Sequence, residues 1–410
     1  MHNPLQVLKH YWGYDGFRPG QAEVIDSILS GHDTLALMPT GGGKSITFQV
    51  PALANPGICL VVSPLVALMK DQVKNLQKRG ILSAFISSEM PHWEILQQLD
   101  NCILGDYKFL YISPERISSE LFQEKLKTLS RKVNLLVVDE AHCISQWGND
   151  FRRDYRLIAD IRDVIPHVQV IAVTASATAA VVADICEQLH FRKGYRIFKT
   201  SFERKNLSFV VRKTDNKLKE ICHILSAVPG SAVIYSRTRK GVEEYAGKLR
   251  AAGISAEYFH AGLDPVLKTE RQADWVKGFT RVLVATNAFG MGIDKGDVRV
   301  VIHTEFPDSM EAYYQEAGRA GRDGKRAYAV ALLGPQDITD IKRRPSNAFP
   351  TIEYIKRVYE ALCNRFQIAE GDGEGVSVYL DEPEFLRDWH FDKGRLRSSL
   401  AVSYTHLRAH

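Results

Sequence analysis

The sequence predicts an α/β protein with two parallel-sheet lobes in tandem, followed by a partial, mainly helical segment. Two observations favour this fold class. Short apolar runs rich in β-branched residues alternate with longer, more polar stretches of helical character, as is typical of a parallel sheet covered by helices. This alternation occurs in two series separated by a polar stretch at residues 201–216, and it ends near Pro345.

The expected strands are the apolar runs themselves. In the first lobe they occupy residues 34–38, 58–62, 109–112, 135–138 and 170–173. In the second lobe they occupy residues 232–235, 256–259, 282–285, 300–302 and 328–332. We therefore assign residues 1–200 to the first lobe and residues 201–345 to the second.

A change of character after Pro345 indicates a third part of the chain at residues 346–401. Thr351 is placed to cap a helix there, in which apolar side chains recur at helical spacing: Ile352, Ile355, Tyr359, Leu362 and Phe366. The last residues, 402–410, show no periodicity and resemble a translated cloning sequence, so we expect them to be non-native.

Composition and charge are those of a multi-domain globular protein. Of the 410 residues, 45% are hydrophobic and 25% charged, and the formal net charge of +5 permits an anionic partner without requiring one. The six cysteines are scattered without a close pair, which argues against a disulfide framework and against a CxxC zinc site. No long apolar segment suggests a signal peptide or a membrane span, so a cytoplasmic protein is expected.

A glycine-rich loop follows the first predicted strand. It consists of Thr40, Gly41, Gly42, Gly43, Lys44 and Ser45, and the stretch after it has helical character. Backbone amides of such a loop and the N-terminus of the next helix surround phosphate oxygens, while the lysine contacts the terminal phosphates. Met38 stands where the strict pattern has glycine, so the match is to a variant phosphate loop. A glycine-rich turn without a ligand is the alternative.

Two adjacent acids, Asp139 and Glu140, follow the apolar run at residues 135–138. This is the carboxyl end of a predicted parallel strand, where open α/β sheets bind ligands. With the phosphate loop, the acids predict hydrolysis of a nucleoside triphosphate: Ser45 and Asp139 hold Mg²⁺, and Glu140 polarises the attacking water. An ordinary helix cap is the alternative for the acid pair alone. For His142, a packing or hydrogen-bonding role and a direct catalytic role both stay open.

Two arginines of the second lobe, Arg319 and Arg322, lie in the stretch QEAGRAGR at residues 315–322. If the lobes face each other across a cleft, these guanidinium groups reach the γ-phosphate as arginine fingers, which contribute about 10³ to 10⁵ in rate. Gln315 is placed to orient the attacking water. Surface salt bridges are the alternative, but the glycines beside both arginines favour a close backbone approach.

In this combination of motifs, the chain resembles the RecQ family of superfamily 2 DNA helicases over about residues 8–335. The most specific match is AHCISQWGNDFR at residues 141–152, which is similar to the aromatic-rich loop that this family carries from its Asp-Glu-Ala-His box onward. Further similar stretches are FRPGQ at 17–21, SPLVALMKDQ at 63–72, SPERI at 113–117, HAGL at 260–263, TNAFGMGID at 286–294 and QEAGRAGRDG at 315–324. The resemblance implies two RecA-like lobes.

The resemblance also implies roles at the nucleotide. Tyr14 would stack on adenine while Arg18 and Gln21 contact the base, which would make ATP the preferred nucleotide. Asp294, at the end of TNAFGMGID, would also contact the nucleotide. Without the resemblance, the aromatic turn around Tyr14 is a packing element of the first lobe.

By the same resemblance, the aromatic-rich loop would sense single-stranded DNA and report it to the nucleotide site. The sensing residues would be Trp147 and Phe151, and the coupling residues Gln146, Arg152 and His142. A hydrophobic staple under a surface loop is the alternative. The chain departs from the family pattern at Asn149, where histidine is common, and at Arg153, where proline is frequent, which leaves the stiffness of this loop open.

DNA contacts are expected from the loops that carry Ser63 and Thr286, through amides and hydroxyls that bind phosphate regardless of sequence. The resemblance implies 3′ to 5′ movement on single-stranded DNA and duplex unwinding in repair or recombination. The family's accessory region supplies four zinc-binding cysteines after the second lobe, whereas only Cys363 is present here, so no structural zinc is expected. A monomer is expected. An RNA helicase, a translocase that does not separate strands, and a binding protein without activity are the alternatives.

Overall fold

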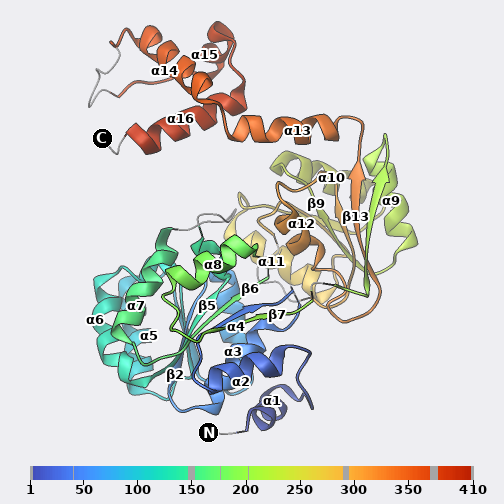
Figure 1. Cartoon of the computed structure of the whole chain (residues 1–410). Coiled ribbons are helices and arrows are strands. Elements are labelled where there is room, and N and C mark those ends of the chain that lie inside the picture. Colours follow the sequence, from blue (N-terminus) through green and yellow to red (C-terminus); the bar gives the residue numbers. More distant parts are fainter. Residues whose placement is uncertain are drawn as a thin grey trace. The chain divides into compact units, whose positions relative to one another are not determined.

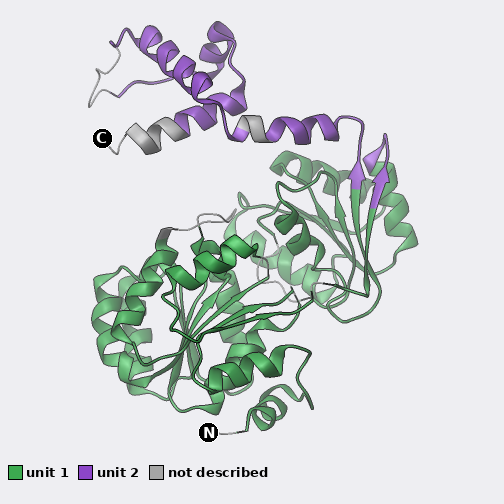
Figure 2. Ribbon diagram, in the orientation of Figure 1, with its two compact units in different colours: residues 1–210, 218–331 green, residues 211–217, 332–410 purple. Residues whose placement is uncertain are grey.

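The structure is a computed structural model that describes residues 3–39, 41–145, 153–175, 177–201, 203–289, 295–369 and 377–407. The chain forms two compact units, one of residues 1–210 with 218–331 and the other of residues 211–217 with 332–410 (Figure 2). The first unit contains most of two parallel sheets, which confirms the predicted α/β fold with two lobes.

The sheet of the first lobe has the order β3-β4-β2-β5-β6-β1-β7, and all of its strand pairs are parallel (Figure 1). Its strands are β1 (Thr34–Leu37), β2 (Ile58–Val62), β3 (Ser83–Ile86), β4 (Phe109–Ile112), β5 (Val133–Asp139), β6 (Val170–Thr174) and β7 (Arg196–Lys199). Because strands β1, β5 and β6 are neighbours in this order, the loops that follow them meet at one edge of the sheet.

Helices cover both faces of this sheet. They are α1 (Pro4–Trp12), α2 (Gln21–Leu29), α3 (Lys44–Ala54), α4 (Val66–Gln77), α5 (His92–Leu104), α6 (Glu120–Leu129), α7 (Ile158–Val164) and α8 (Ala179–Gln188). Short 3₁₀ helices lie at η1 (Pro114–Arg116), η2 (Ser130–Lys132), η3 (Ala141–Ile144) and η4 (Arg153–Leu157). Side chains of α1 to α4 pack in one hydrophobic cluster and those of α5 to α8 in another.

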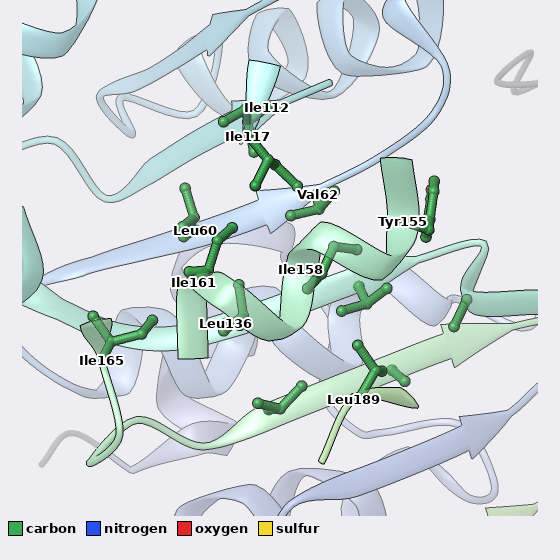
Figure 3. Packing of buried hydrophobic residues seen from close by; sticks show 14 of the residues in the cluster. Leu60, Val62, Ile112, Ile117, Leu136, Tyr155, Ile158, Ile161, Ile165 and Leu189 are labelled. Carbon is green, nitrogen blue, oxygen red and sulfur yellow. The ribbon is translucent and has the colours of Figure 1, made fainter. Parts of the chain in front are cut away.

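The strand sequences explain why both faces are covered. Successive residues of a strand point to opposite faces, so Leu35 and Leu37 enter one cluster and Ala36 enters the other. Strands β1, β2, β4 and β6 are buried along their whole length, which is why they are continuous apolar runs. Figure 3 shows Ile158 and Ile161 of α7 beside Leu60 of β2 and Leu136 of β5.

The second lobe repeats this architecture with the strand order β10-β11-β9-β12-β13-β8. Its strands are β8 (Leu207–Lys213), β9 (Ser231–Tyr235), β10 (Ala256–Phe259), β11 (Val282–Ala285), β12 (Val298–His303) and β13 (Ala327–Leu333). Its helices are α9 (Lys217–Ala227), α10 (Arg239–Ala251), α11 (Pro265–Lys277) and α12 (Met310–Ala317). The buried core includes the indole of Trp275, whose Nε1 donates to the carbonyl of Ala232 at 3.1 Å.

Three strands were not among the predicted apolar runs: β3, β7 and β8. All three lie at sheet edges in the two strand orders. In β7 three of the four residues are exposed, and β8 alternates between buried or half-buried and exposed positions before ending in exposed residues. A less completely covered edge strand needs no continuous apolar run, which explains the weak sequence signal of β7 and β8. Strand β3 is buried at three of its four residues, and there Ser83 interrupts the apolar stretch.

The second unit is mainly helical, as predicted for the segment after Pro345. It contains α13 (Asp337–Ala348), α14 (Ile352–Phe366), α15 (Glu382–Trp389) and α16 (Lys393–Leu407), around a small core that includes Val358, Phe385 and Leu396. The predicted cap of α14 is confirmed, because the Thr351 side chain accepts from the amide of Tyr354 at 3.3 Å. In the part of the chain that the structure describes, no helix is both long enough and apolar enough to cross a bilayer.

Candidate active site

A cavity of about 660 Å³ is lined by residues of both lobes in the first unit. It collects most of the residues predicted for nucleotide binding and hydrolysis: Tyr14, Arg18, Gln21, Gly41, Gly43, Lys44, Ser45, Asp139, Glu140, Gln315, Arg319 and Arg322. Other predicted residues, namely Gly42, Ser63, His142 and Thr286, are described but do not line this cavity. Thr40, Gln146, Trp147, Phe151, Arg152 and Asp294 lie outside the described residues.

The phosphate loop joins β1 to α3 with a backbone that depends on glycine. Gly41 and Gly43 both have φ of 78°, in the left-handed region that favours glycine. A Cβ on Gly43 would lie 2.4 Å from Gln21 Nε2, so a side chain here would displace the amide of Gln21. Gly43 is the N-cap of α3, which directs the helix N-terminus at the cavity.

Met38, which stands where the strict pattern has glycine, still belongs to the sheet, so the chain does not need glycine there. Its side chain is buried, and its amide donates to the carbonyl of Thr174 at 3.0 Å, which continues the pairing of β1 with β6 beyond the last strand residue. The loop therefore turns away from the sheet after Met38, where Gly42 donates to the carbonyl of Pro39 at 2.9 Å.

The acid pair lies at the end of β5. Asp139 Oδ1 accepts from the amide of Glu140 at 3.0 Å, and Asp139 Oδ2 accepts from the hydroxyl of Ser63 at 3.4 Å. Glu140 has φ of 47°, and its Oε1 lies 3.8 Å from Lys44 Nζ of the phosphate loop. Ser63, which was expected to contact DNA, is itself fully buried beside this carboxylate.

These oxygens fit a hard divalent cation. Burial, followed by the charge of Glu140, raises the pKa of Asp139 from 3.8 to about 6, although Lys44 lowers it. Glu140 Oε2 is buried and has no hydrogen-bond donor among the described residues. Carboxylate and hydroxyl oxygens are the protein ligands that Mg²⁺ accepts. A cation bound by Asp139 and Ser45, both of which line the cavity, would offset the cost of keeping this buried carboxylate charged.

His142 connects the acid pair to the neighbouring strand. Its Nδ1 shares a 2.8 Å hydrogen bond with Thr174 Oγ1 at the end of β6, and lies 3.5 Å from Glu140 Oε2. The structure therefore gives His142 a hydrogen-bonding partner outside the acid pair.

The described residues on either side of the aromatic-rich loop are anchored to the first lobe. Before the loop, the hydroxyl of Ser145 donates to Asp184 Oδ2 at 2.5 Å. After the loop, the hydroxyl of Tyr155 donates to the backbone carbonyl of Asp139 at 2.9 Å, and the ring of Tyr155 is fully buried. Sequence reasoning did not single out Tyr155, because a buried tyrosine in a polar stretch does not reveal its distant partner.

Arg18 and Gln21, which also line the cavity, hold the phosphate loop. Arg18 Nη1 donates to the carbonyl of Gly41 at 2.8 Å, and Gln21 Nε2 donates to the carbonyls of Gly42 and Gly43 at 3.3 and 3.1 Å. Tyr14 is 53% exposed while lining the cavity. This exposure argues against the alternative in which the Tyr14 ring is a packing element of the first lobe.

The second lobe contributes Gln315 from α12 and both arginines from the turn that follows it. A Cβ on Gly41 would lie 3.2 Å from Arg322 Cγ, so the arginine side chain passes directly over the phosphate loop. Arg319 is hydrogen bonded to Tyr235, whose hydroxyl donates to the carbonyl of Phe289 at 3.1 Å. Burial raises the pKa of Tyr235 to about 12, so this hydroxyl keeps its proton near neutral pH.

Two residues between the lobes also contact this turn. Arg204 and Asn206 donate to several of its backbone carbonyls. Sequence reasoning placed both in the polar stretch at residues 201–216 and assigned them no role. Their basic and amide side chains in a connecting segment were a weak signal, because the partners lie more than 100 residues away.

Comparison with known proteins identifies the class. Residues 18–185 match the family model "DEAD/DEAH box helicase", and residues 216–324 match "Helicase conserved C-terminal domain". Among solved structures, the helicase MrfA bound to DNA and AMPPNP superposes with a TM-score of 0.69 at 18% identity, over 84% of this chain and 52% of that one. The protein thus has the two-lobed fold of superfamily 2 helicases.

Curated relatives narrow the class to one family. The ATP-dependent DNA helicase RecQ of Bacillus subtilis is 43% identical over 341 residues, which cover 82% of this chain and 57% of that protein. The probable ATP-dependent DNA helicase RecS of the same organism is 40% identical over 337 residues, which cover 81% of this chain and 67% of that protein. The chain belongs to the RecQ family. It spans little more than half the length of the RecQ protein it matches.

Proposed function

We propose that this chain is an ATP-dependent DNA helicase in which DNA stimulates ATP hydrolysis. One observation carries the proposal: a single cavity is lined by the phosphate loop and acid pair of the first lobe and by Gln315, Arg319 and Arg322 of the second. A nucleotide bound there touches both lobes, so hydrolysis and release change the contact between them. The relatives named as DNA helicases support DNA as the nucleic acid on which the protein acts.

The residues divide the chemistry among them. Lys44 and the loop amides bind the β- and γ-phosphates, and Ser45 with Asp139 would hold Mg²⁺, which neutralises charge on those phosphates when bound. Glu140 accepts a hydrogen bond from the attacking water and orients it for attack in line with the leaving oxygen. Arg319 and Arg322 stabilise the negative charge of the transition state from the second lobe, and Gln315 assists in placing the water.

The base end of the nucleotide is assigned to Tyr14, Arg18 and Gln21. The exposed ring of Tyr14 offers a stacking surface for adenine. Arg18 and Gln21 already donate to the carbonyls of the phosphate loop, so a base that binds them also affects that loop. We assign Asp294 and Thr40 to the nucleotide as well, by their places in the motifs.

DNA sensing is assigned to the aromatic-rich loop, with Trp147 and Phe151 stacking on bases and Gln146 and Arg152 relaying the contact. Stacking one base on an aromatic side chain contributes about 1 to 3 kcal/mol, which compares with about 1.4 kcal/mol for opening one base-pair step. The hydrogen bond from Tyr155 to Asp139 leads from the end of this loop to the acid pair.

We assign the coupling of DNA binding to the acid pair to three further residues, Ser63, His142 and Thr286. Ser63 and His142 would connect the DNA-facing loops to Asp139 and Glu140, since both side chains lie within reach of these acids. Thr286 is 7% exposed and would act through the loop that it begins.

Movement is proposed to run 3′ to 5′ along one strand with duplex unwinding, in DNA repair or recombination, by a monomer in the bacterial cytoplasm or nucleoid. An RNA helicase is the second candidate, because the two-lobed fold is shared. A DNA translocase without strand separation is the third.

The test is phosphate release with Mg²⁺ and ATP, with and without single-stranded DNA, followed by strand separation on duplexes with a 3′ or a 5′ single-stranded tail. We expect DNA to stimulate hydrolysis and only the 3′-tailed duplex to be opened. Stimulation without opening of either duplex would support the translocase. Stronger stimulation by RNA of the same sequence would support the RNA helicase, and a chain that binds DNA without hydrolysing ATP would contradict all three.

A further inference from the structure

The segment between the lobes reaches the turn that carries the two arginines of the second lobe. The guanidinium of Arg204 donates to three backbone carbonyls of this turn: Gly318 at 3.4 Å, Ala320 at 3.0 Å and Gly321 at 2.8 Å. These residues flank Arg319 on both sides and directly precede Arg322. One planar cation therefore restrains the backbone from which both arginine side chains leave.

Asn206 holds the same turn from a second point. Its Nδ2 donates to the carbonyls of Gly321 and Lys325 at 2.7 and 2.9 Å, and its Oδ1 accepts from Arg204 Nε at 3.3 Å. Its backbone carbonyl accepts from the amide of Ala327, the first residue of β13, at 2.9 Å. A Cβ on Gly321, where φ is 64°, would lie 2.6 Å from Asn206 Nδ2, so glycine is what permits this approach.

The charge of Arg204 suits this place. The turn follows the C-terminus of α12, where carbonyl groups lack helical partners and the helix dipole favours a cation. Burial lowers the pKa of Arg204, and three charge-assisted hydrogen bonds to backbone carbonyls offset the cost of that partial burial. A lysine here would keep the charge, but its ammonium group lacks the planar set of donors with which a guanidinium reaches three carbonyl groups at once.

Arg204 also lies next to the phosphate loop of the first lobe. A Cβ on Gly41 would be 3.8 Å from Arg204 Nη1 and 3.2 Å from Arg322 Cγ. Arg204, which donates to the backbone of the turn that carries Arg319 and Arg322, is therefore adjacent to the phosphate loop, although it is not among the residues that line the cavity.

We propose that Arg204 and Asn206 are positioning residues that hold the turn at residues 318–325, so that Arg319 and Arg322 are aligned with the γ-phosphate. The proposal rests on the proposed function, because it concerns the same hydrolysis. It predicts that the segment between the lobes sets the rate of hydrolysis after ATP has bound, and contributes little to the binding of ATP.

The test uses the full chain with three substitutions: Arg204→Gln, Arg204→Lys and Lys205→Gln. Displacing a catalytic group by about 1 Å costs about a hundredfold in rate, so Arg204→Gln should lower the DNA-stimulated kcat by about 10- to 100-fold with KM for ATP within about threefold. Arg204→Lys should lose at least about fivefold. Lys205→Gln is the matched control, because it removes a neighbouring exposed cation that makes no hydrogen bond or ion pair to the turn among the described residues, and its kcat should stay within about twofold.

A double substitution separates positioning from a general loss of structure. If Arg204 acts through the two arginines, Arg204→Gln adds less than about threefold loss when Arg319 and Arg322 are both already alanine, measured in single-turnover reactions with enzyme in excess. The full 10- to 100-fold loss in that background, or a rise in KM without a fall in kcat, would overturn the proposal.

Hydrogen exchange of the turn supplies a readout that does not depend on activity. Amides at residues 318–326 should exchange faster in Arg204→Gln than in the unaltered chain and in Lys205→Gln, and equal exchange in all three would overturn the proposal. If the unaltered chain hydrolyses no ATP, the proposed function fails, while the exchange measurement still decides whether Arg204 holds the turn.

Discussion

The buried acid pair at the end of β5 makes a specific prediction about stability. Replacing Asp139 with asparagine removes one charge while keeping the shape and the acceptor for the amide of Glu140. The pKa of Asp139 is raised from 3.8 to about 6. At about 1.4 kcal/mol per pH unit, keeping this carboxylate charged at about pH 8 costs the metal-free folded chain on the order of 3 kcal/mol. Asp139→Asn should therefore stabilise the metal-free protein while abolishing hydrolysis.

The sign of the pH dependence follows from the raised pKa. Below about pH 4 the carboxyl is protonated in both the folded and the unfolded chain, so Asp139→Asn changes little. Between about pH 4 and pH 6 the unfolded chain ionises Asp139 before the folded chain does, so the advantage of the asparagine variant grows and has its full value once the pH has risen through about 6.

Thermal unfolding of the first lobe, followed by fluorescence in a chelator, measures this effect. A domain of this size shifts by about 2–4 °C per kcal/mol, so Asp139→Asn should unfold at least about 5 °C higher at pH 8, and Mg²⁺ should stabilise only the unaltered chain. Asp106→Asn, in an exposed loop, is the control and should change neither property. An Asp139→Asn variant that unfolds at the same or a lower temperature at pH 8 would refute the reasoning.

Three further substitutions test the path from the aromatic-rich loop to the nucleotide. Gly43→Ala puts a Cβ 2.4 Å from Gln21 Nε2 and should weaken binding of a fluorescent ATP analogue at least about tenfold. Tyr155→Phe removes the hydrogen bond to the carbonyl of Asp139 and should lower DNA-stimulated kcat about fivefold, as measured by phosphate release. Trp147→Ala should lower DNA-stimulated hydrolysis far more than basal hydrolysis, and equal losses would contradict a sensing role.

Each of these has a matched control in the chain. Gly80→Ala places alanine at a similar φ of 75° with nothing within 4 Å, so it carries the backbone strain without the clash. Tyr107→Phe alters a half-buried tyrosine of the same lobe, and Trp93→Ala removes an indole that is 67% exposed. A control that lost as much activity as its partner would indicate a general effect on the fold.

Much of the site was predictable because parallel sheets impose one geometry. The phosphate loop follows β1 and the acid pair ends β5, and strands separated only by β6 bring both to the same edge. Continuous apolar runs marked these central strands, since burial on both faces requires them. The placement of Lys44 near Glu140 therefore follows from the order of motifs along the chain.

The contacts that hold the turn at residues 318–325 could not be predicted from the order of motifs along the chain. Arg204 and Gly321 are 117 residues apart, and a basic residue in a polar connecting segment gives no indication of which carbonyl it will meet. Asn206 precedes an edge strand, β8, whose half-exposed pattern was itself missed. Side chains that bind distant backbone leave no periodicity, so only the folded chain reveals them.

The extended pairing of Met38 has a consequence for how the first lobe responds to a nucleotide. The amide of Met38 donates a hydrogen bond to the carbonyl of Thr174, and the hydroxyl of Thr174 shares a hydrogen bond with His142 Nδ1. The entry to the phosphate loop and the partner of His142 thus belong to one hydrogen-bonded layer of the sheet. A displacement of β6 would reach both the phosphate loop and the residue beside the acid pair at once, through the sheet and without a moving hinge.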